Sequence, residues 1–257
     1  MADIAQLEDM LRELGVRPGG VLMMHSSLSG TGWSPTEVRD AIRAALGTDG
    51  TLVVPSFTPE NSDTSPAHHR LTEGMTERER AEFRASMPPF EPNATPCPAM
   101  GALAECVRTT PGAIRSAHPQ TSFAALGPRA EELLAGHDPH CHLGERSPMA
   151  ALYAADAQVL LLRVGFEVCT AFHLAEYRMT PTPPSRTYRC VTKAKGNWIE
   201  YEDLSLHDRD FGEIGALLPH DLCTEGEFAG RPAFLFGMRD AVDTAQHLMS
   251  GYRSRMT

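Results

Sequence analysis

No run of apolar residues in this 257-residue chain approaches the roughly 20 needed to span a bilayer. The N-terminal stretch MADIAQLEDMLREL is amphipathic and acidic, unlike the basic and then apolar start of a secretory signal. The six cysteines are scattered and include no CxxC pair, which is typical of reduced thiols and not of a disulfide framework. These absences predict a cytoplasmic protein that neither crosses nor binds a membrane.

Positive charge is also scarce. Lys and Arg total 23 against 33 Asp and Glu, a formal net charge of −10. This balance argues against nucleic acid and anionic membranes as partners and favours a cationic ligand. GxSxG, GxGxxG and GxxxxGK[ST] are likewise missing, so covalent hydrolase chemistry and standard nucleotide binding have no motif to support them.

What is present is an alternation of strands and helices. A short apolar strand at 21–24 ends at His25, and Ser34-Pro35-Thr36-Glu37 has the composition of a helix start, with a capping serine and a glutamate three residues later. A second buried strand at 52–57 completes a strand–helix–strand unit with parallel strands. The pattern predicts a soluble α/β protein.

Residues 58–98 differ from the rest because they are rich in proline and poor in apolar residues, with one expected helix around 76–86. A segment this long between core elements is either a functional lid or binding loop, or a poorly ordered insertion.

The stretch 157–178 joins a strand and a helix. The strand at 159–164 is apolar enough to be buried on both faces, Gly165 breaks it, and Thr170 can cap a following helix. His173 and Glu176 then share one helical face near the end of a core strand, where an imidazole suits general acid–base work. Considered alone, the pattern favours a histidine packed against the sheet.

Other candidate sites have two interpretations each. The loop HSSLSGTG at 25–32 is either an anion-binding loop or a plain turn, and RSAHP at 115–119 is either a ligand site or a structural loop. His137, His140, Cys141 and His142 look like metal ligands, but without a paired distant motif we expect no metal site. On the strand after a predicted hairpin turn at 195–197, alternation sends Glu202 to one face and Asp203 to the other.

Together the motifs resemble the aminoglycoside 3-N-acetyltransferase family, whose fold is unrelated to the common acetyl-CoA-binding fold of GNAT enzymes. The matches occur in the family's order over nearly the whole chain: HSSLSGTG at 25–32, DGTLVVPSF at 49–57, RSAHPQTSFAALG at 115–127, SPMAAL at 147–152, VLLLRVGFEVCTAFHLAEYR at 159–178, and the C-terminal GEFAGRPAFLFGMRDAVDTA.

The resemblance implies a single α/β domain over 1–257, a three-layer α/β/α protein with a central mixed sheet and a smaller lobe on the substrate side, in which 58–98 is a substrate-side loop and helix insertion. It implies acetyl transfer from acetyl-CoA to the 3-amino group of a 2-deoxystreptamine aminoglycoside, by direct attack in a ternary complex, which would confer antibiotic resistance. It implies His173 as general base, with Glu202 as its partner carboxylate and Asp203 as the fallback. The residues implied for acetyl-CoA are His25, Ser26, Ser27, Leu28, Arg115, Ser116, His118 and Ser122. Those implied for the polycationic antibiotic are Glu60, Asp63, Glu91, Glu202 and Asp203.

Two departures keep alternatives open. Residues 58–98 and the hairpin sequence TKAKGNW match the family poorly, so an N-acyltransferase of the same fold acting on a non-antibiotic or biosynthetic amine is the alternative function. A protein that sequesters a cation without chemistry is a second alternative, and a metal-dependent hydrolase built on HDPHCH is a third. A homodimer is an open alternative to a monomer.

Overall fold

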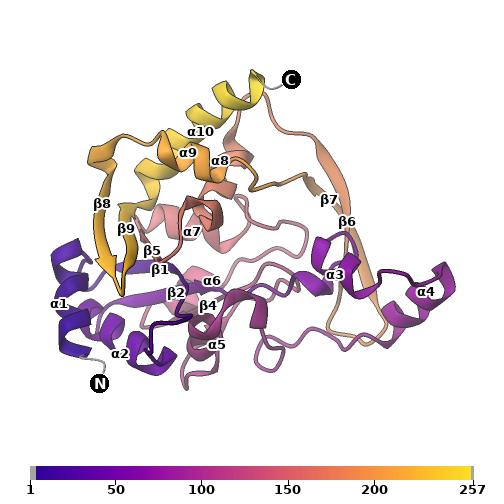
Figure 1. Cartoon of the computed structure of the whole chain (residues 1–257). Coiled ribbons are helices and arrows are strands. Elements are labelled where there is room, and N and C mark those ends of the chain that lie inside the picture. Colours follow the sequence, from indigo (N-terminus) through magenta and orange to yellow (C-terminus); the bar gives the residue numbers. More distant parts are fainter. Residues whose placement is uncertain (1–3, 256–257) are drawn as a thin grey trace.

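The computed structural model describes residues 4–255 and contains one central sheet of seven strands (Figure 1). The three middle strands β2, β1 and β5 are parallel, and the flanking strands pair antiparallel. In spatial order the strands are β3 (Ile114–Arg115), β4 (Phe123–Leu126), β2 (Thr51–Pro55), β1 (Val21–Ser26), β5 (Gln158–Leu162), β9 (Arg231–Gly237) and β8 (Cys223–Phe228). The predicted mixed sheet is confirmed.

Local sequence signals set the first strand–helix–strand unit. The Ser34 side chain accepts a hydrogen bond from the Glu37 N–H while the Glu37 carboxylate accepts one from the Ser34 N–H, which is the predicted capping box. Helix α2 (Pro35–Leu46) then ends at Gly47, whose φ of 71° suits glycine. Helix α2 is the crossover that connects β1 to β2, and these two strands pair in parallel with Val21 opposite Thr51.

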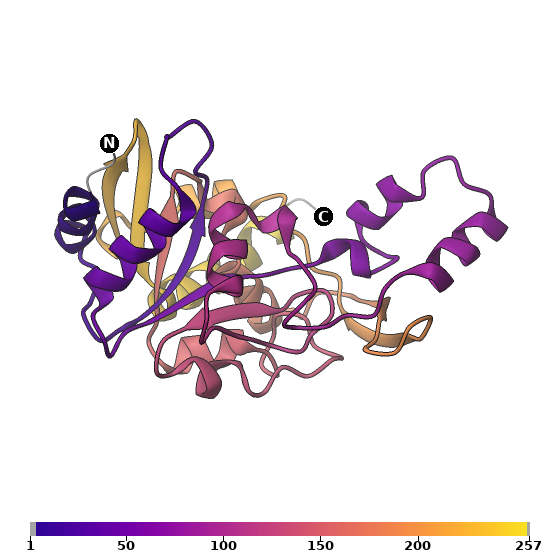
Figure 2. The same ribbon diagram turned by 90° about the horizontal axis from the view of Figure 1, so that it is seen from below.

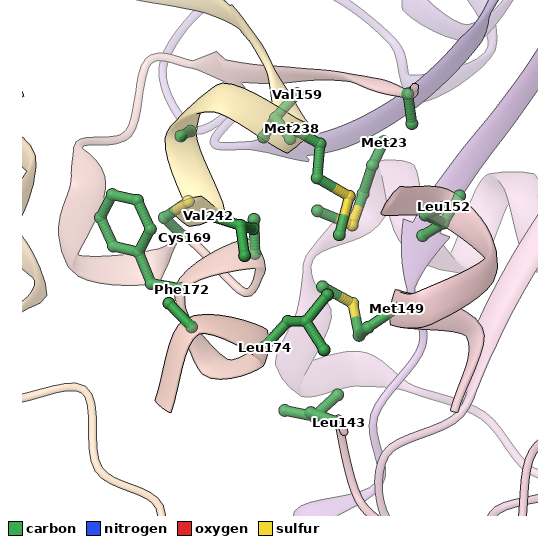
Figure 3. Packing of buried hydrophobic residues seen from close by; sticks show 14 of the residues in the cluster. Met23, Leu143, Met149, Leu152, Val159, Cys169, Phe172, Leu174, Met238 and Val242 are labelled. Atoms are coloured by element: carbon green, nitrogen blue, oxygen red, sulfur yellow. The ribbon is translucent and has the colours of Figure 1, made fainter. Parts of the chain in front are cut away.

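Helices cover both faces of the sheet, so the predicted three layers are confirmed. On one face lie α1 (Ile4–Leu14), α2 and α5 (Ala102–Thr109). The other face carries α6 (Ala130–Leu134), α7 (Pro148–Ala154), α8 (Ala171–Arg178), α9 (Phe211–Ala216) and α10 (Met238–Ser254). Figure 3 shows the second core, where Met23, Met149 and Met238 meet between the sheet and Phe172 and Leu174 of α8. Burial of these side chains fixes the helix that carries His173.

The segment 58–98 forms an ordered lobe with a two-stranded hairpin, β6 (Ser185–Val191) and β7 (Trp198–Leu204). It contains η1 (Pro59–Asn61), α3 (Pro66–Leu71) and α4 (Glu77–Ser86), and Figure 2 shows the lobe extending away from the sheet. Phe90 N–H donates to Thr192 O at 2.9 Å, and the Arg189 guanidinium pairs with the buried Asp63 carboxylate. The insertion and the hairpin therefore stabilise each other.

Several boundaries differ from the sequence-based expectation. Strand β5 ends at Leu162 because Arg163 adopts a φ of 62°, which breaks the extended backbone before Gly165. Strand β8, strand β3 and helix α3 were not predicted, and Thr170 precedes α8 without a side-chain capping bond. Short turns of 3-10 helix, η2 (Pro98–Met100), η3 (Phe166–Val168) and η4 (His220–Leu222), complete the connections. None of the helices within residues 4–255 is long and apolar enough to cross a membrane.

Candidate active site

His173 lies on α8 with its ring against a buried carboxylate. Its Nδ1 is 2.5 Å from Glu176 Oε2, one helical turn further along, and the Glu176 side chain is only 1% exposed. The Phe211 ring packs 4.8 Å from the His173 ring between centroids. A carboxylate only accepts, so Nδ1–H donates to it, and the neutral ring keeps its lone pair on Nε2.

Glu202, expected as the partner of His173, does not reach it. Its side chain is exposed on β7 and accepts a hydrogen bond from Thr187 across the hairpin. The fallback Asp203 points inward, as alternation predicts, and accepts hydrogen bonds from His142 and from Tyr177 OH, the latter at 2.6 Å. The expected pairing of Glu202 with His173 is therefore wrong in this structure, and Glu176 takes that position.

A pocket of about 360 Å³ lies where the parallel strands β1, β2 and β5 end. Ligands of open α/β sheets commonly bind at the carboxyl ends of strands. His25, Ser26 and His173 line the pocket together with Glu167 and Asp208. Much of the apolar lining comes from β1, β2 and the residues just after it, η2 and α5, namely Met24, Val54, Pro55, Phe57, Met100, Leu103 and Ala104. The pocket thus joins two histidines and two carboxylates to an apolar wall.

His25, at the end of β1, is held neutral. Burial, and to a smaller extent the nearby His173, lower its pKa to about 4. Its Nε2 is buried and finds no hydrogen-bond partner among the residues that the structure describes. A neutral imidazole in the wall of this pocket can form one hydrogen bond with a ligand but adds no charge to the pocket.

The residues of the 25–32 loop that follow Ser26 stabilise the pocket wall. Ser27 N–H donates to Leu162 O at 3.1 Å, and Leu28 packs against the core beneath α1 and α2. Arg163 donates to the carbonyl oxygens of Ser27 and Ser29 and to that of Ala229 in the β8–β9 turn. Of the four residues expected to bind acetyl-CoA here, His25 and Ser26 face the pocket, whereas Ser27 and Leu28 hold the loop.

The residues expected to contact acetyl-CoA from 115–122 are buried instead. Arg115 donates to Ser122 Oγ at 2.9 Å and to Ser56 O at 2.5 Å, and burial lowers its pKa to about 10. Ser116 Oγ accepts from Phe123 N–H and bonds the His137 ring. Their exposed fractions are 7% for Arg115, 3% for Ser116 and 0% for Ser122. These guanidinium and hydroxyl groups are used inside the protein, and their contact with acetyl-CoA stays a prediction.

His118 is fully buried as well. Its Nδ1 accepts from Gln120 N–H and Thr121 N–H, each at 3.1 Å, so its proton lies on Nε2, facing Tyr201 OH at 3.4 Å. The His118 ring stacks on His137 at 4.7 Å, and burial holds the pKa of His118 well below its usual value. His118 is thus a packing and hydrogen-bonding centre and not a pocket residue.

The HDPHCH segment belongs to the same buried cluster. His137 and His142 are 8% and 2% exposed, and the neighbouring His140 ring stacks on Tyr201. No group of three or more His, Cys, Asp or Glu side chains within residues 4–255 is arranged to hold a metal ion. The cluster instead joins the loops of the main sheet to the inner face of β7.

The carboxylates expected to bind the antibiotic are only partly available. Asp63 is buried and paired with Arg189, and Asp203 is bonded to His142 and Tyr177. Glu60 is partly exposed at η1, and Glu91 is exposed near the base of the lobe. Glu60 and Glu91 stay predictions, whereas Asp63 and Asp203 are used as structural partners.

Sequence reasoning missed the two carboxylates of the pocket. Glu167 lies in η3, directly before the His173 helix, and Asp208 lies before α9. Glu167 follows the same strand–Gly165 signal that located His173, so its position was open to inference. Nothing in the sequence signalled Asp208, because it reaches the pocket across a chain separation that only the tertiary structure closes.

Comparison with known proteins agrees with this architecture. The sequence profile of aminoglycoside 3-N-acetyltransferases matches residues 23–250. The SPbeta prophage-derived aminoglycoside N(3')-acetyltransferase-like protein YokD of Bacillus subtilis (strain 168) is 33% identical, over 92% of this chain and 88% of YokD. Aminoglycoside N(3)-acetyltransferase III of Pseudomonas aeruginosa is 30% identical, over 92% of this chain and 89% of that protein.

Solved structures give the same result. The crystal structure of YokD from Bacillus subtilis has a TM-score of 0.89 and 32% identity, covering 98% of this chain and 94% of YokD. The structure of AAC-VIa bound to sisomicin has a TM-score of 0.79 and 26% identity, covering 98% of each chain. The expected antibiotic acetyltransferase fold is confirmed. The chain belongs to the aminoglycoside 3-N-acetyltransferase family and is an acyltransferase of that family.

Proposed function

We propose that this enzyme transfers the acetyl group of acetyl-CoA directly to the 3-amino group of a 2-deoxystreptamine aminoglycoside, with His173 as general base and Glu176 as the carboxylate that orients it. The observation that carries this proposal is the His173–Glu176 hydrogen bond of 2.5 Å in the wall of the pocket. Family membership supports the reaction class.

The ring of His173 has the tautomer that a base needs. Nδ1–H donates to Glu176, so Nε2 holds the free lone pair. In the transfer, the amine nitrogen attacks the thioester carbonyl carbon, the new C–N bond forms, and the C–S bond breaks. His173 Nε2 takes the proton released by the amine and passes it to the departing CoA sulfur, so the overall charge balances.

The pocket suits the two reacting ends. Its volume of about 360 Å³ lies in the range of small-molecule sites. The apolar wall near Val54 and Leu103 fits the acetyl methyl and the pantetheine chain, while Glu167 and Asp208 carry the charge that attracts ammonium groups. Glu60 and Glu91 are further candidates for amines at the outer edge, as part of the same proposal.

The experiment is an acetylation assay on the purified protein that follows free CoA thiol over a panel of amines. Several 2-deoxystreptamine aminoglycosides are compared with streptomycin, which lacks that ring, and the acetylated position is assigned by NMR. We expect turnover of 2-deoxystreptamine compounds with acetylation at N3. Turnover of other amines alone would favour the alternative N-acyltransferase, and no turnover of any 2-deoxystreptamine compound would refute the proposed substrate.

The role of His173 has its own test. Loss of a general base typically costs about 10²–10⁴ in kcat, so His173→Ala is expected to fall in that range. His220→Ala is the matched control, because His220 is exposed on η4, away from the pocket lining. Turnover of His173→Ala within about tenfold of wild type would refute the base assignment.

A further inference from the structure

The carboxylate behind His173 has a second charged partner from the far end of the chain. Arg253, in the last turn of α10, donates from Nη1 to Glu176 Oε1 at 2.7 Å, while the other Glu176 oxygen accepts from His173. Glu176 Oε1 also accepts the His207 backbone N–H at 3.3 Å. Both oxygens of this buried carboxylate are therefore committed, and its plane is fixed by groups from α8, the loop before α9, and α10.

Arg253 is itself held by a further carboxylate. Its Nε and Nη2 donate to the two oxygens of Asp210, each at 2.7 Å, and Nη2 also approaches His207 O at 3.3 Å. The side chains of Arg253 and Asp210 are 16% and 10% exposed. Burial alone lowers the pKa of Arg253, but hydrogen bonding to Asp210 and the charge of Glu176 outweigh it and raise that pKa. Burial raises the pKa of Asp210, and the Arg253 bonds outweigh this and lower it.

A planar guanidinium with donors on two edges can clamp two carboxylates at once, which a lysine ammonium cannot do with the same geometry. The four side chains thus form a row, His173–Glu176–Arg253–Asp210, in which charges alternate if His173 is protonated. The charge nearest to Glu176 decides how strongly that carboxylate stabilises an imidazolium.

We propose that Arg253 and Asp210 are positioning residues for the acetyl transfer: Arg253 fixes the Glu176 carboxylate against His173 and weakens its pull on the His173 proton, and Asp210 sets how strongly Arg253 does so. The inference rests on the proposed role of His173 as base. It extends that role to two residues that do not touch the His173 ring. Neither motif matching nor helical spacing points to either of them.

The row predicts that removing the charge of Arg253 and removing the charge of Asp210 have opposite effects on the pH dependence of kcat/KM. Without the Arg253 charge, Glu176 stabilises the imidazolium more strongly, so the acidic limb moves to higher pH. Without the Asp210 charge, Arg253 acts on Glu176 at full strength, so the limb moves to lower pH. Each shift is expected to be about one pH unit, since a full charge in partly buried surroundings acts over a few ångströms. The other titratable groups around His173 and Glu176 are His25, His142, Glu167, His207 and Asp208, and none of them is mutated in these variants.

The experiment measures the pH profiles of kcat and kcat/KM for Arg253→Met, Arg253→Lys and Asp210→Asn, from initial rates over a range of aminoglycoside concentrations with acetyl-CoA saturating. We expect the acidic limb of Arg253→Met to rise by about one unit with kcat reduced about tenfold, and that of Asp210→Asn to fall. Arg253→Lys keeps the charge but not the two-edged geometry, so its limb stays near wild type while kcat falls. A merely structural role would lower kcat in all three variants without opposite shifts.

Arg255→Met is the matched control. It removes the same charge two residues further along, from an exposed side chain just beyond α10, and should leave the profile unchanged. A second readout needs no turnover: long-range ¹H–¹⁵N spectra of the imidazoles, with the His173 signal assigned by its loss in His173→Gln. The His173 titration midpoint should move as the profile does.

The two proposals can fail separately. If His173→Ala stays active, the base assignment is lost. If His173→Ala is inactive but the His173 midpoint does not move, or moves in the same direction in Arg253→Met and Asp210→Asn, only the role of Arg253 and Asp210 is refuted. Should Arg253→Met not fold, the other two variants decide: the role is refuted if the His173 midpoint does not fall in Asp210→Asn, or if it moves in Arg253→Lys.

Discussion

The buried histidine cluster between the main sheet and the hairpin makes folding stability depend on pH, and His137 gives the size of the effect. His137 Nε2–H donates to Cys141 O and His142 O at 3.2 and 3.0 Å, so Nδ1 accepts from Ser116 OH at 3.0 Å. Burial lowers the pKa of His137 from 6.5 to about 4. Every hydrogen bond of the ring is thus satisfied in the neutral form.

The sign follows from proton linkage. The unfolded chain binds a proton at His137 near pH 6.5, but the folded chain does so only near pH 4. The stabilisation is fully present above pH 6.5 and is lost progressively as the pH falls from 6.5 toward 4. At pH 5 the loss from His137 alone is about 2 kcal/mol, from 1.36 kcal/mol per unit over the interval already crossed. Burial lowers the pKa values of His118 and His142 too, so they act in the same direction.

The assay is urea unfolding at pH 7.5 and pH 5.0 for wild type and His137→Gln. Glutamine does not titrate, so the pH-induced loss of stability should be smaller in the variant by about 2 kcal/mol, or about 0.7 M in the urea midpoint if m is about 3 kcal/mol/M. The comparison uses the difference between two pH values, so any loss common to both cancels. His247→Gln, exposed on α10, is the control. An equal pH dependence in wild type and His137→Gln would refute this reasoning.

Three further predictions concern the site. Glu176→Gln should lower kcat at least about tenfold, because Gln can present a donor to Nδ1 and favour the wrong tautomer, whereas Glu202→Gln should stay within about twofold; steady-state kinetics of the pair decides. Arg163→Ala should lower the free energy of unfolding, measured in urea, by about 2 kcal/mol, because the hydrogen bonds of Arg163 to carbonyl oxygens are lost. Arg163→Gly should lower it by about 1 kcal/mol less, because a φ of 62° suits glycine, and equal losses would contradict this. Asp208→Asn should raise the KM for a polycationic aminoglycoside several-fold at low salt and less at about 0.5 M salt, which initial rates at two ionic strengths measure.

Local sequence signals located the helix that carries His173 correctly. The apolar strand, Gly165 and the following helix placed His173 near the carboxyl end of a core strand. Helical spacing put Glu176 beside it. The family resemblance favoured Glu202 instead. The contact three residues away prevailed because it needs only one turn of helix, whereas Glu202 lies on the solvent side of β7.

The family motifs identified the protein class but not the use of each polar residue. RSAHP and the serine at 122 look like ligand-binding groups, yet Arg115 and Ser122 bond to each other and to Ser56 O inside the fold. The sequence alone does not distinguish a buried arginine, whose guanidinium binds backbone carbonyl groups, from an exposed arginine that is free to bind a phosphate. Burial separates them, and burial is a property of the packed molecule.

The sequence by itself determined the fold class, the βαβ unit with its capped helix, the hairpin and the position of His173, because each depends on periodicity or on contacts within a few residues. Only the tertiary structure decided what surrounds that histidine. Asp208 reaches the pocket from the loop before α9, and Arg253 reaches Glu176 across 77 residues of chain. Such long-range contacts are set by how helices α8 and α10 pack on the sheet, and no local pattern encodes them.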